Sequence, residues 1–272
     1  MKAERVGLLL ASFAAILWAA PFAWMAVASV RPGVAGASDI ASLWPSGPYS
    51  LANFRDAWDS GQFPLWYLNT ALLCAGIFAV QAVTVSLAGY AFARVNFRGR
   101  ETVFVLFLLQ LLLPPAVLVV PNLNMITKTG LFDSLAGIGA PYCASAFGVF
   151  LMRQTFRSIP RDFEEAARMD GASRLAIIRD VLIPLARPGL AAFAVVSVSS
   201  HWNEFLWPLM AVSSPRNQVL TVGLASFTLS SESGGEWGVI AAGTALVAAP
   251  LLIGFAIFQR RFVANLVSTG LK

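Results

Sequence analysis

Charged side chains are scarce in this sequence. Asp, Glu, Lys and Arg make up 12% of the 272 residues, whereas hydrophobic residues make up 57%. Soluble globular domains contain about 25% charged residues, so the composition excludes an ordinary soluble protein. It indicates instead a chain that crosses a membrane several times.

Cysteine and histidine are also rare. Cys74 and Cys143 both lie inside apolar stretches and lack the short spacing of a metal site, so we expect small hydrophobic side chains without a disulfide framework. His201 is the only histidine, and the G-x-S-x-G elbow is absent, so no nucleophile is accompanied by a base. The sequence therefore predicts no catalytic residues, no metal site and no enzyme.

A phosphate-binding loop of the form G-x-x-x-x-G-K-[ST] is absent too. We therefore expect this chain to bind no cofactor, and any ATP that drives its function must be hydrolysed by another polypeptide. A formal charge of +5 would suit a nucleic-acid ligand. The arginines are dispersed over short loops, however, and this favours membrane topology over nucleic-acid binding.

Six intervals are long and apolar enough to cross a bilayer. About 20 apolar residues span the hydrocarbon, and a charge at its centre costs roughly 2.5 to 3.5 kcal/mol. The sequence therefore predicts an all-α membrane protein with six transmembrane helices in a single domain, residues 1–272, in which only the fifth span contains a charge, Glu204. The intervals are 6–30, 60–93, 102–127, 134–152, 188–215 and 237–259.

The first interval has a second interpretation, as a cleaved signal peptide. Lys2 and Arg5 precede it, and the Ala-Val-Ala sequence of residues 26–28 resembles a cleavage site. The uncharged run of 25 residues is longer than a usual signal core and includes Pro21 and two tryptophans. We expect a retained transmembrane helix.

Lys and Arg are unevenly distributed over the connecting segments. With the amino terminus inside, the inner segments contain 15 of the 19 basic residues, and the outer loops contain four. The positive-inside rule then places both termini, the long loop 153–189 and the carboxy-terminal tail 260–272 in the cytoplasm. The first outer loop, residues 31–64, is rich in Gly, Pro and Ser and includes Trp44, and we expect irregular structure there.

The loop 153–189 contains seven arginines and five acidic residues, so we expect it to lie in water. Asp162 and Glu165 have the spacing of a capping box, which predicts a helix over residues 163–170. One face of this helix would carry a narrow ridge of mostly small side chains: Phe163, Ala166, Ala167 and Asp170.

A second short helix is expected after the first. Gly171 can adopt the left-handed conformation that ends a helix. Ser173 can cap a following helix over residues 174–183, and Pro184 is expected to end it.

The spacing of these residues resembles a known motif. Glu165-Ala166-Ala167 is followed after three residues by Gly171, and after nine more by residues 181–184, Val-Leu-Ile-Pro. This is similar to the EAA motif of ABC-importer permeases, EAA-x3-G-x9-I-x-L-P, with one aliphatic residue exchanged for another at two positions. In that family the loop forms a coupling helix that docks into the ATP-hydrolysing subunit. The resemblance implies these ATPase-coupling residues: Phe163, Glu164, Glu165, Ala166, Ala167, Arg168, Met169, Asp170, Gly171 and Ala172.

Further segments resemble the MalG-like carbohydrate permease subunits, and together they cover nearly the whole chain. They include residues 89–94 (Gly-Tyr-Ala-Phe-Ala-Arg), 202–205 (Trp-Asn-Glu-Phe) and 241–243 (Ala-Ala-Gly). The tail 260–272 departs from that subgroup because it lacks the final Lys-Gly ending. The resemblance implies a type I ABC importer permease with a MetI-like core, multi-pass in a bacterial inner membrane, importing a carbohydrate or related polyol.

The same resemblance implies the partners. A second permease subunit would complete the pore as a heterodimer, and two copies of a cytoplasmic ABC ATPase would bind ATP and Mg. An extracytoplasmic solute-binding protein would deliver the solute.

Polar residues inside the spans are candidates for the translocation path. The amide side chains among them could equally form hydrogen bonds between neighbouring helices. They are Gln81, Gln110, Asn122, Asn124, Trp202, Asn203 and Glu204. Glu204 with His201 could instead carry protons in a secondary transporter, or Glu204 with Asn203 could form a polar knot between helices. A structural or assembly role in the membrane is a third class of function. Pro114, Pro115 and Pro121 are expected to break the third span.

Overall fold

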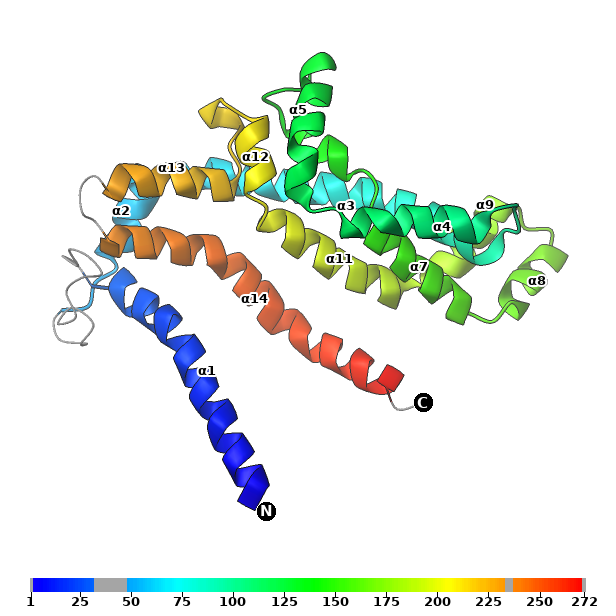
Figure 1. Ribbon diagram of the computed structural model, residues 1–272, viewed down its shortest axis with the longest axis horizontal. Helices are drawn as coiled ribbons and strands as arrows, with labels where there is room; N and C mark the ends of the chain where they lie inside the picture. Colours follow the sequence, from blue (N-terminus) through cyan, green and yellow to red (C-terminus); the bar gives the residue numbers. More distant parts are fainter. Residues whose placement is uncertain (1, 32–47, 233–236, 271–272) are drawn as a thin grey trace. The chain divides into compact units, whose positions relative to one another are not determined.

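The computed structural model describes residues 2–31, 48–232 and 237–270, and these residues form helices without any strand (Figure 1). This confirms the all-α prediction. The chain forms two compact units, Met1–Pro64 with Leu220–Lys272, and Leu65–Val219. The first holds α1 (Lys2–Ser29), α2 (Ala52–Ser60), α13 (Leu220–Glu232) and α14 (Trp237–Gly270), and α3 (Phe63–Arg94) begins in it and continues into the second. The second also holds α4 (Arg100–Leu108), α5 (Val119–Lys128), α6 (Leu135–Gly139), α7 (Ala146–Ser158), α8 (Asp162–Met169), α9 (Arg174–Ala176), α10 (Ile183–Leu185), α11 (Arg187–Trp202) and α12 (Leu206–Ala211).

In the first unit, α14 packs against α1, α2 and α13. The buried side chain of Asn53, on α2, donates hydrogen bonds to the carbonyls of Ala28, Ser29 and Arg31. These carbonyls lie at the end of α1 and just beyond it, where regular helical hydrogen bonding stops. The prediction of irregular structure over residues 31–64 was therefore wrong for its second half, whereas Trp44 lies outside the described residues.

Three helical stretches are continuous and apolar enough to span a membrane: Leu10–Ser29, α3 and Trp237–Gly254. Three more candidate spans are bent pairs, so the described residues contain up to six spans. The number agrees with the sequence prediction, and the sequence predicted the break in the third interval but not the breaks in the fourth and fifth. The third bent pair joins Arg174–Leu185 to Arg187–Trp202 at 76°, so it begins in the charged loop. In the fourth interval, α6 and α7 are separated by a short turn that contains Pro141, and the pair is bent by 49°.

The third interval breaks where the proline pair predicted a break. Its two halves, Arg100–Leu112 and Pro115–Lys128, are bent by 98°. Leu113 is extended, with ψ of 122°, because the ring of a following proline disfavours helical backbone. Pro121 lies near the start of α5 and does not break the helix, so this part of the prediction was wrong.

The fifth interval breaks at residues 203–205, between α11 and α12, which the sequence pattern did not predict. In a continuous helix the ring of Pro208 would clash with the carbonyl of Glu204, four residues earlier. At the break, the side-chain amide of Asn203 donates a hydrogen bond to the backbone carbonyl of Ser199 at 2.8 Å. The break leaves Glu204 at the junction of two helices.

Helices α3 and α7 come close at Gly89. A Cβ atom there would lie 2.7 Å from Cβ of Met152 and 3.1 Å from the backbone nitrogen of Arg153. Gly89→Val should therefore destabilise the protein by about 1 to 3 kcal/mol through overpacking. Gly76→Val is the matched control, since Gly76 is on the same helix and a Cβ atom there would meet no atom within 4 Å. Unfolding in detergent micelles measures both, and equal stability of the two variants would contradict this packing.

Asp133 fixes the connection between α5 and α6 to the segment after α12. Its carboxylate accepts hydrogen bonds from the hydroxyl and backbone N–H of Ser214 and from the N–H of Ser213, and its carbonyl accepts one from Asn217. The bond from the Ser214 hydroxyl is the largest cause that holds the pKa of this carboxyl well below its usual 3.8.

This connection should weaken in acid. Because the folded pKa of Asp133 is lowered, its contribution is complete above about pH 4 and is lost as the pH falls toward the folded value. Thermal unfolding between pH 3 and 7 should show a smaller acid-induced fall in melting temperature for Asp133→Asn than for the wild type. Parallel curves would contradict the assignment.

Candidate functional site

Helix α8 is part of the charged loop and lies at one end of the second unit (Figure 1). It begins at Asp162, and the carbonyl of Arg161 accepts from the N–H groups of Glu164 and Glu165. The predicted capping box was wrong, because Asp162 is already inside the helix and makes no capping bond. Its carboxylate still lies at the positive end of the helix dipole.

The turn after α8 follows the prediction. Gly171 has φ of +80°, and the N–H of Ala172 donates to the carbonyl of Ala167 at 3.0 Å, which closes the helix. Ser173 caps the next helix by accepting from the N–H of Ala176. That helix, however, continues through Pro184 to Leu185 by way of a π-helical segment, Ile177–Leu182. Pro184 therefore does not end it, because the widened turn before the proline accommodates the missing N–H donor.

The outward face of α8 is apolar. Phe163, Ala166 and Met169 follow at intervals of three residues, and all three are exposed, Met169 by 87%. Exposed residues at this spacing form one stripe along a helix. A stripe of this kind in a charged loop is a candidate surface for binding another protein.

The inward face of α8 carries a buried ion pair. Glu164 Oε1 lies 2.8 Å from Nε of Arg94, the last residue of α3, and both side chains are 7% exposed. Arg94 also donates hydrogen bonds to the backbone carbonyls of Phe156 and Ile159, at the end of α7. One guanidinium therefore joins α3, α7 and α8.

A second arginine joins α7 to α4. Arg153 donates to both carboxylate oxygens of Glu101 at 2.7 Å and to the carbonyl of Phe92. Its guanidinium carbon lies 4.0 Å from the ring centre of Phe104. The expectation that the whole loop 153–189 lies in water was therefore wrong for Arg153, which is in α7 and buried. The ion pair with Glu101 compensates for the burial of the Arg153 charge.

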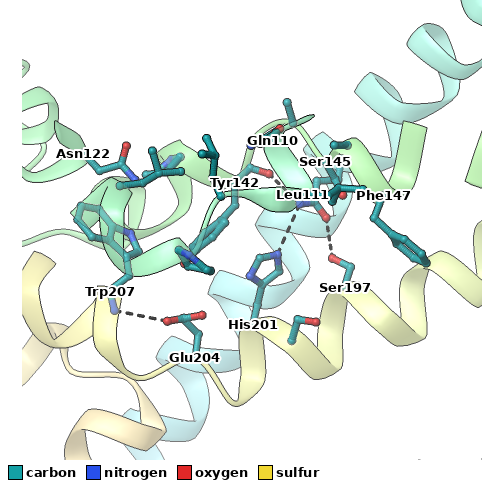
Figure 2. Close-up of a pocket in the computed structure, with 18 of the residues that line it drawn as sticks. Gln110, Leu111, Asn122, Tyr142, Ser145, Phe147, Ser197, His201, Glu204 and Trp207 are labelled. Carbon is teal, nitrogen blue, oxygen red and sulfur yellow. Dashed lines mark hydrogen bonds between the residues drawn. The ribbon is translucent and has the colours of Figure 1, made fainter. Parts of the chain in front are cut away.

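A cavity of about 380 Å³ opens in the second unit beside α11 (Figure 2). At its wall the side chain of Gln81, on α3, accepts a hydrogen bond from the hydroxyl of Ser197 at 2.6 Å. The same amide donates to the carbonyl of Tyr142 at 2.8 Å and lies 3.5 Å from Nε2 of His201. This network joins α3, α11 and the turn after α6.

Polar and aromatic side chains face the rest of the cavity. Figure 2 shows His201, Glu204 and Trp207 around it, and the Glu204 carboxylate accepts from the backbone N–H of Trp207 at 3.4 Å. Gln110 and Asn122 line the opposite side. No lysine or arginine is among the described residues that line this cavity.

Comparison with known proteins decides the family. The family described as "Binding-protein-dependent transport system inner membrane component" matches residues 85–267. The chain belongs to this family. It is therefore a transport subunit of an inner membrane and not an enzyme.

The similar relatives are also permeases. The permease is 31% identical over 263 residues to the arabinooligosaccharides transport system permease protein AraQ of Halalkalibacterium halodurans, covering 96% of this chain and 94% of the relative. It is 34% identical over 230 residues to the sn-glycerol-3-phosphate transport system permease protein UgpE of Pectobacterium atrosepticum, covering 82% of each chain. The proton-coupled alternative finds no support among these relatives.

A solved structure shares the fold. A chain of a bacterial ABC transporter involved in the import of the acidic polysaccharide alginate aligns with a TM-score of 0.85 at 24% identity. The alignment covers 95% of the permease and 96% of that chain. The fold is therefore that of an ABC importer permease, as predicted.

The cavity gathers some of the predicted translocation residues and not others. Gln81, Gln110, Asn122 and Glu204 line it, whereas Asn124, Trp202 and Asn203 do not. The side chain of Asn203 is exposed and donates to the carbonyl of Ser199 in α11, so Asn203 is not part of a buried polar knot.

Several residues of the permease were missed by sequence reasoning. Arg94 ends an apolar span and was counted only as a topology charge. Ser197 and Tyr142 carry no distinctive pattern, although their neighbours around the cavity are polar. The break caused by Pro208 is the one signal that could have placed the Glu204 carboxylate at a helix junction.

Proposed function

We propose that this chain is one of two permease subunits of an ATP-driven importer for a carbohydrate or related polyol, and that ATP hydrolysis is coupled to it through α8. The outward apolar stripe of α8 carries the proposal: Phe163, Ala166 and Met169 face solvent in a loop that is rich in charged residues. Exposed apolar side chains flanked by charge are suited to a cleft on a partner protein. The resemblance of residues 165–184 to the EAA motif supports the ATPase as that partner.

The remaining subunits are proposed from the family resemblance. This sequence has no phosphate-binding loop, and the resemblance implies that two copies of a cytoplasmic ABC ATPase bind the ATP and Mg. A second, different permease subunit supplies the other half of the pore, and an extracytoplasmic solute-binding protein delivers the solute. Both termini are cytoplasmic, because this orientation places 15 of 19 basic residues on the inner side.

The cavity beside α11 is this subunit's part of the translocation path. Polar side chains at membrane depth are costly unless they pair or face water or a polar solute. Amides, a carboxylate and the aromatic ring of Trp207 offer the hydrogen-bonding and stacking surfaces that a sugar ring uses. The Glu204 carboxylate, without a lysine or arginine in the lining, favours an uncharged solute over a phosphorylated or acidic one.

Solute-stimulated ATP hydrolysis by the reconstituted complex tests this function. Neutral arabino-oligosaccharides, sn-glycerol 3-phosphate and alginate oligosaccharides are compared in the presence of the binding protein. We expect stimulation by a neutral carbohydrate or polyol and a reduced uptake rate for Gln110→Leu. Ala116→Leu is the control, since Ala116 is exposed on the same broken span and does not line the cavity. Stimulation by the phosphorylated or acidic solutes alone would contradict the proposed solute class.

A further inference from the structure

We infer that the buried pair formed by Arg94 and Glu164 transmits the movement of α8 to the membrane helices. This inference rests on the proposed coupling role of α8 and assigns different roles to its two faces. Phe163, Ala166 and Met169 form the docking face. Glu164 is a positioning residue that faces the permease itself.

The helix geometry separates the two faces. Successive residues of an α-helix are about 100° apart, so Glu164 points nearly opposite to the middle of the stripe formed by residues 163, 166 and 169. The exposed fractions of the whole residues agree with this geometry, since Glu164 is 5% exposed and Met169 is 87% exposed. Glu165, its acidic neighbour, is exposed and does not share this environment.

Arg94 connects Glu164 to two other helices. It ends α3, its Nε lies 2.8 Å from the Glu164 carboxylate, and its terminal nitrogen donates to the carbonyl of Phe156 at 2.6 Å. A planar guanidinium can form an ion pair with a carboxylate and also donate to backbone carbonyls, which the single ammonium of lysine does less well. The amino end of α8 is thus held to the cytoplasmic ends of α3 and α7 by groups that are shielded from water.

The helices that receive this contact are themselves held together. At Gly89 the backbone of α3 meets α7 so closely that a Cβ atom would lie 2.7 Å from Cβ of Met152. Arg153 binds Glu101 and the carbonyl of Phe92, and so ties α7 to α4 and α3. Movement of α8 would therefore be transmitted to a packed group of three helices, α3, α4 and α7, and not to a single mobile segment.

Other contacts of α8 are weaker candidates for this role. It packs against the π-helical segment Ile177–Leu182, which leads toward α11. Among the residues that the structure describes in α8, however, only Glu164 forms an ion pair with a side chain of a membrane helix. Because buried pairs keep a fixed geometry only when both partners remain, loss of one partner should loosen the connection.

Glu164→Gln in the reconstituted complex tests the inference, because it keeps the side-chain shape and removes the charge. Asp162→Asn is the matched control, an acid-to-amide change on the same helix at an exposed position. The readouts are solute transported per ATP hydrolysed and co-purification of the ATPase. We expect Glu164→Gln to retain the ATPase and to lower transport per ATP by about twofold to thirtyfold, the range seen for mutations along a coupling route.

Two outcomes would overturn the inference. Unchanged transport per ATP in Glu164→Gln would show that the pair carries no movement. Release of the ATPase from Glu164→Gln would show that the ion pair only holds α8 in the orientation that the ATPase binds. Failure of the proposed function is distinguishable, because then a double variant of the outward face, Phe163→Asp with Met169→Asp, would also leave ATPase binding and transport unchanged.

Discussion

Phe163→Asp combined with Met169→Asp is expected to abolish co-purification of the ATPase with the permease complex. Both side chains are exposed on the outward face of α8, and docking would bury them. Burial of a Phe or Met side chain contributes about 1.5 to 3 kcal/mol, so loss of both should weaken association at least about 100-fold. The buried carboxylates would add a desolvation cost. Binding of the purified ATPase to the permease complex in nanodiscs measures the change.

The control for this experiment keeps the face apolar. Met169→Leu alone retains a hydrophobic side chain of similar volume and should bind the ATPase within about tenfold of the wild type, since a swap of Met for Leu usually costs less than about 1.5 kcal/mol. Wild-type affinity of the double Asp variant would show that α8 is not the docking element.

Arg94→Met is expected to lower the free energy of unfolding by about 3 to 5 kcal/mol, because it leaves the Glu164 carboxylate buried without its partner. The double variant Arg94→Met with Glu164→Met should recover a large part of this loss, since an apolar pair of similar volume leaves no buried charge. Unfolding in detergent micelles of the wild type, Arg94→Met, Glu164→Met and the double variant gives the four free energies from which the coupling between the two positions is calculated.

Arg98 provides the control for the stability measurements on the Arg94 and Glu164 variants. It is exposed in the connection between α3 and α4, only four residues away, and Arg98→Met should change the stability by less than about 0.5 kcal/mol. A loss in Arg98→Met equal to that in Arg94→Met would point to a general effect of removing cytoplasmic charge. A loss in the double variant equal to the sum of the losses in Arg94→Met and Glu164→Met would contradict a direct interaction.

The sequence predicted the membrane spans better than their continuity. Hydrophobicity locates an apolar interval, but it does not distinguish a straight helix from a bent one. Pro114 and Pro115 were correctly expected to break a helix, because two consecutive rings leave no alternative. Pro141 and Pro208 have the same local effect, yet each is a single proline in an apolar stretch, where neighbouring helices can also restore the lost contacts.

The coupling loop shows both the strength and the limit of sequence reasoning. The turn at Gly171 and the cap at Ser173 depend on residues close in sequence, and both predictions were confirmed. The partner of Glu164 is Arg94, seventy positions earlier, and only the tertiary fold brings the two together. Counting charges placed every arginine of the loop in water, because a count cannot show that the Arg153 guanidinium is paired.

The central claim, that ATP drives transport through this permease, is tested most directly by solute uptake into proteoliposomes that contain the complete complex. ATP is enclosed with the ATPase side, and a protonophore is added to a parallel sample. Our account predicts uptake that requires ATP and persists when the proton gradient is dissipated. Uptake that proceeds without the ATPase and stops with the protonophore would contradict the account and would favour proton coupling through His201 and Glu204.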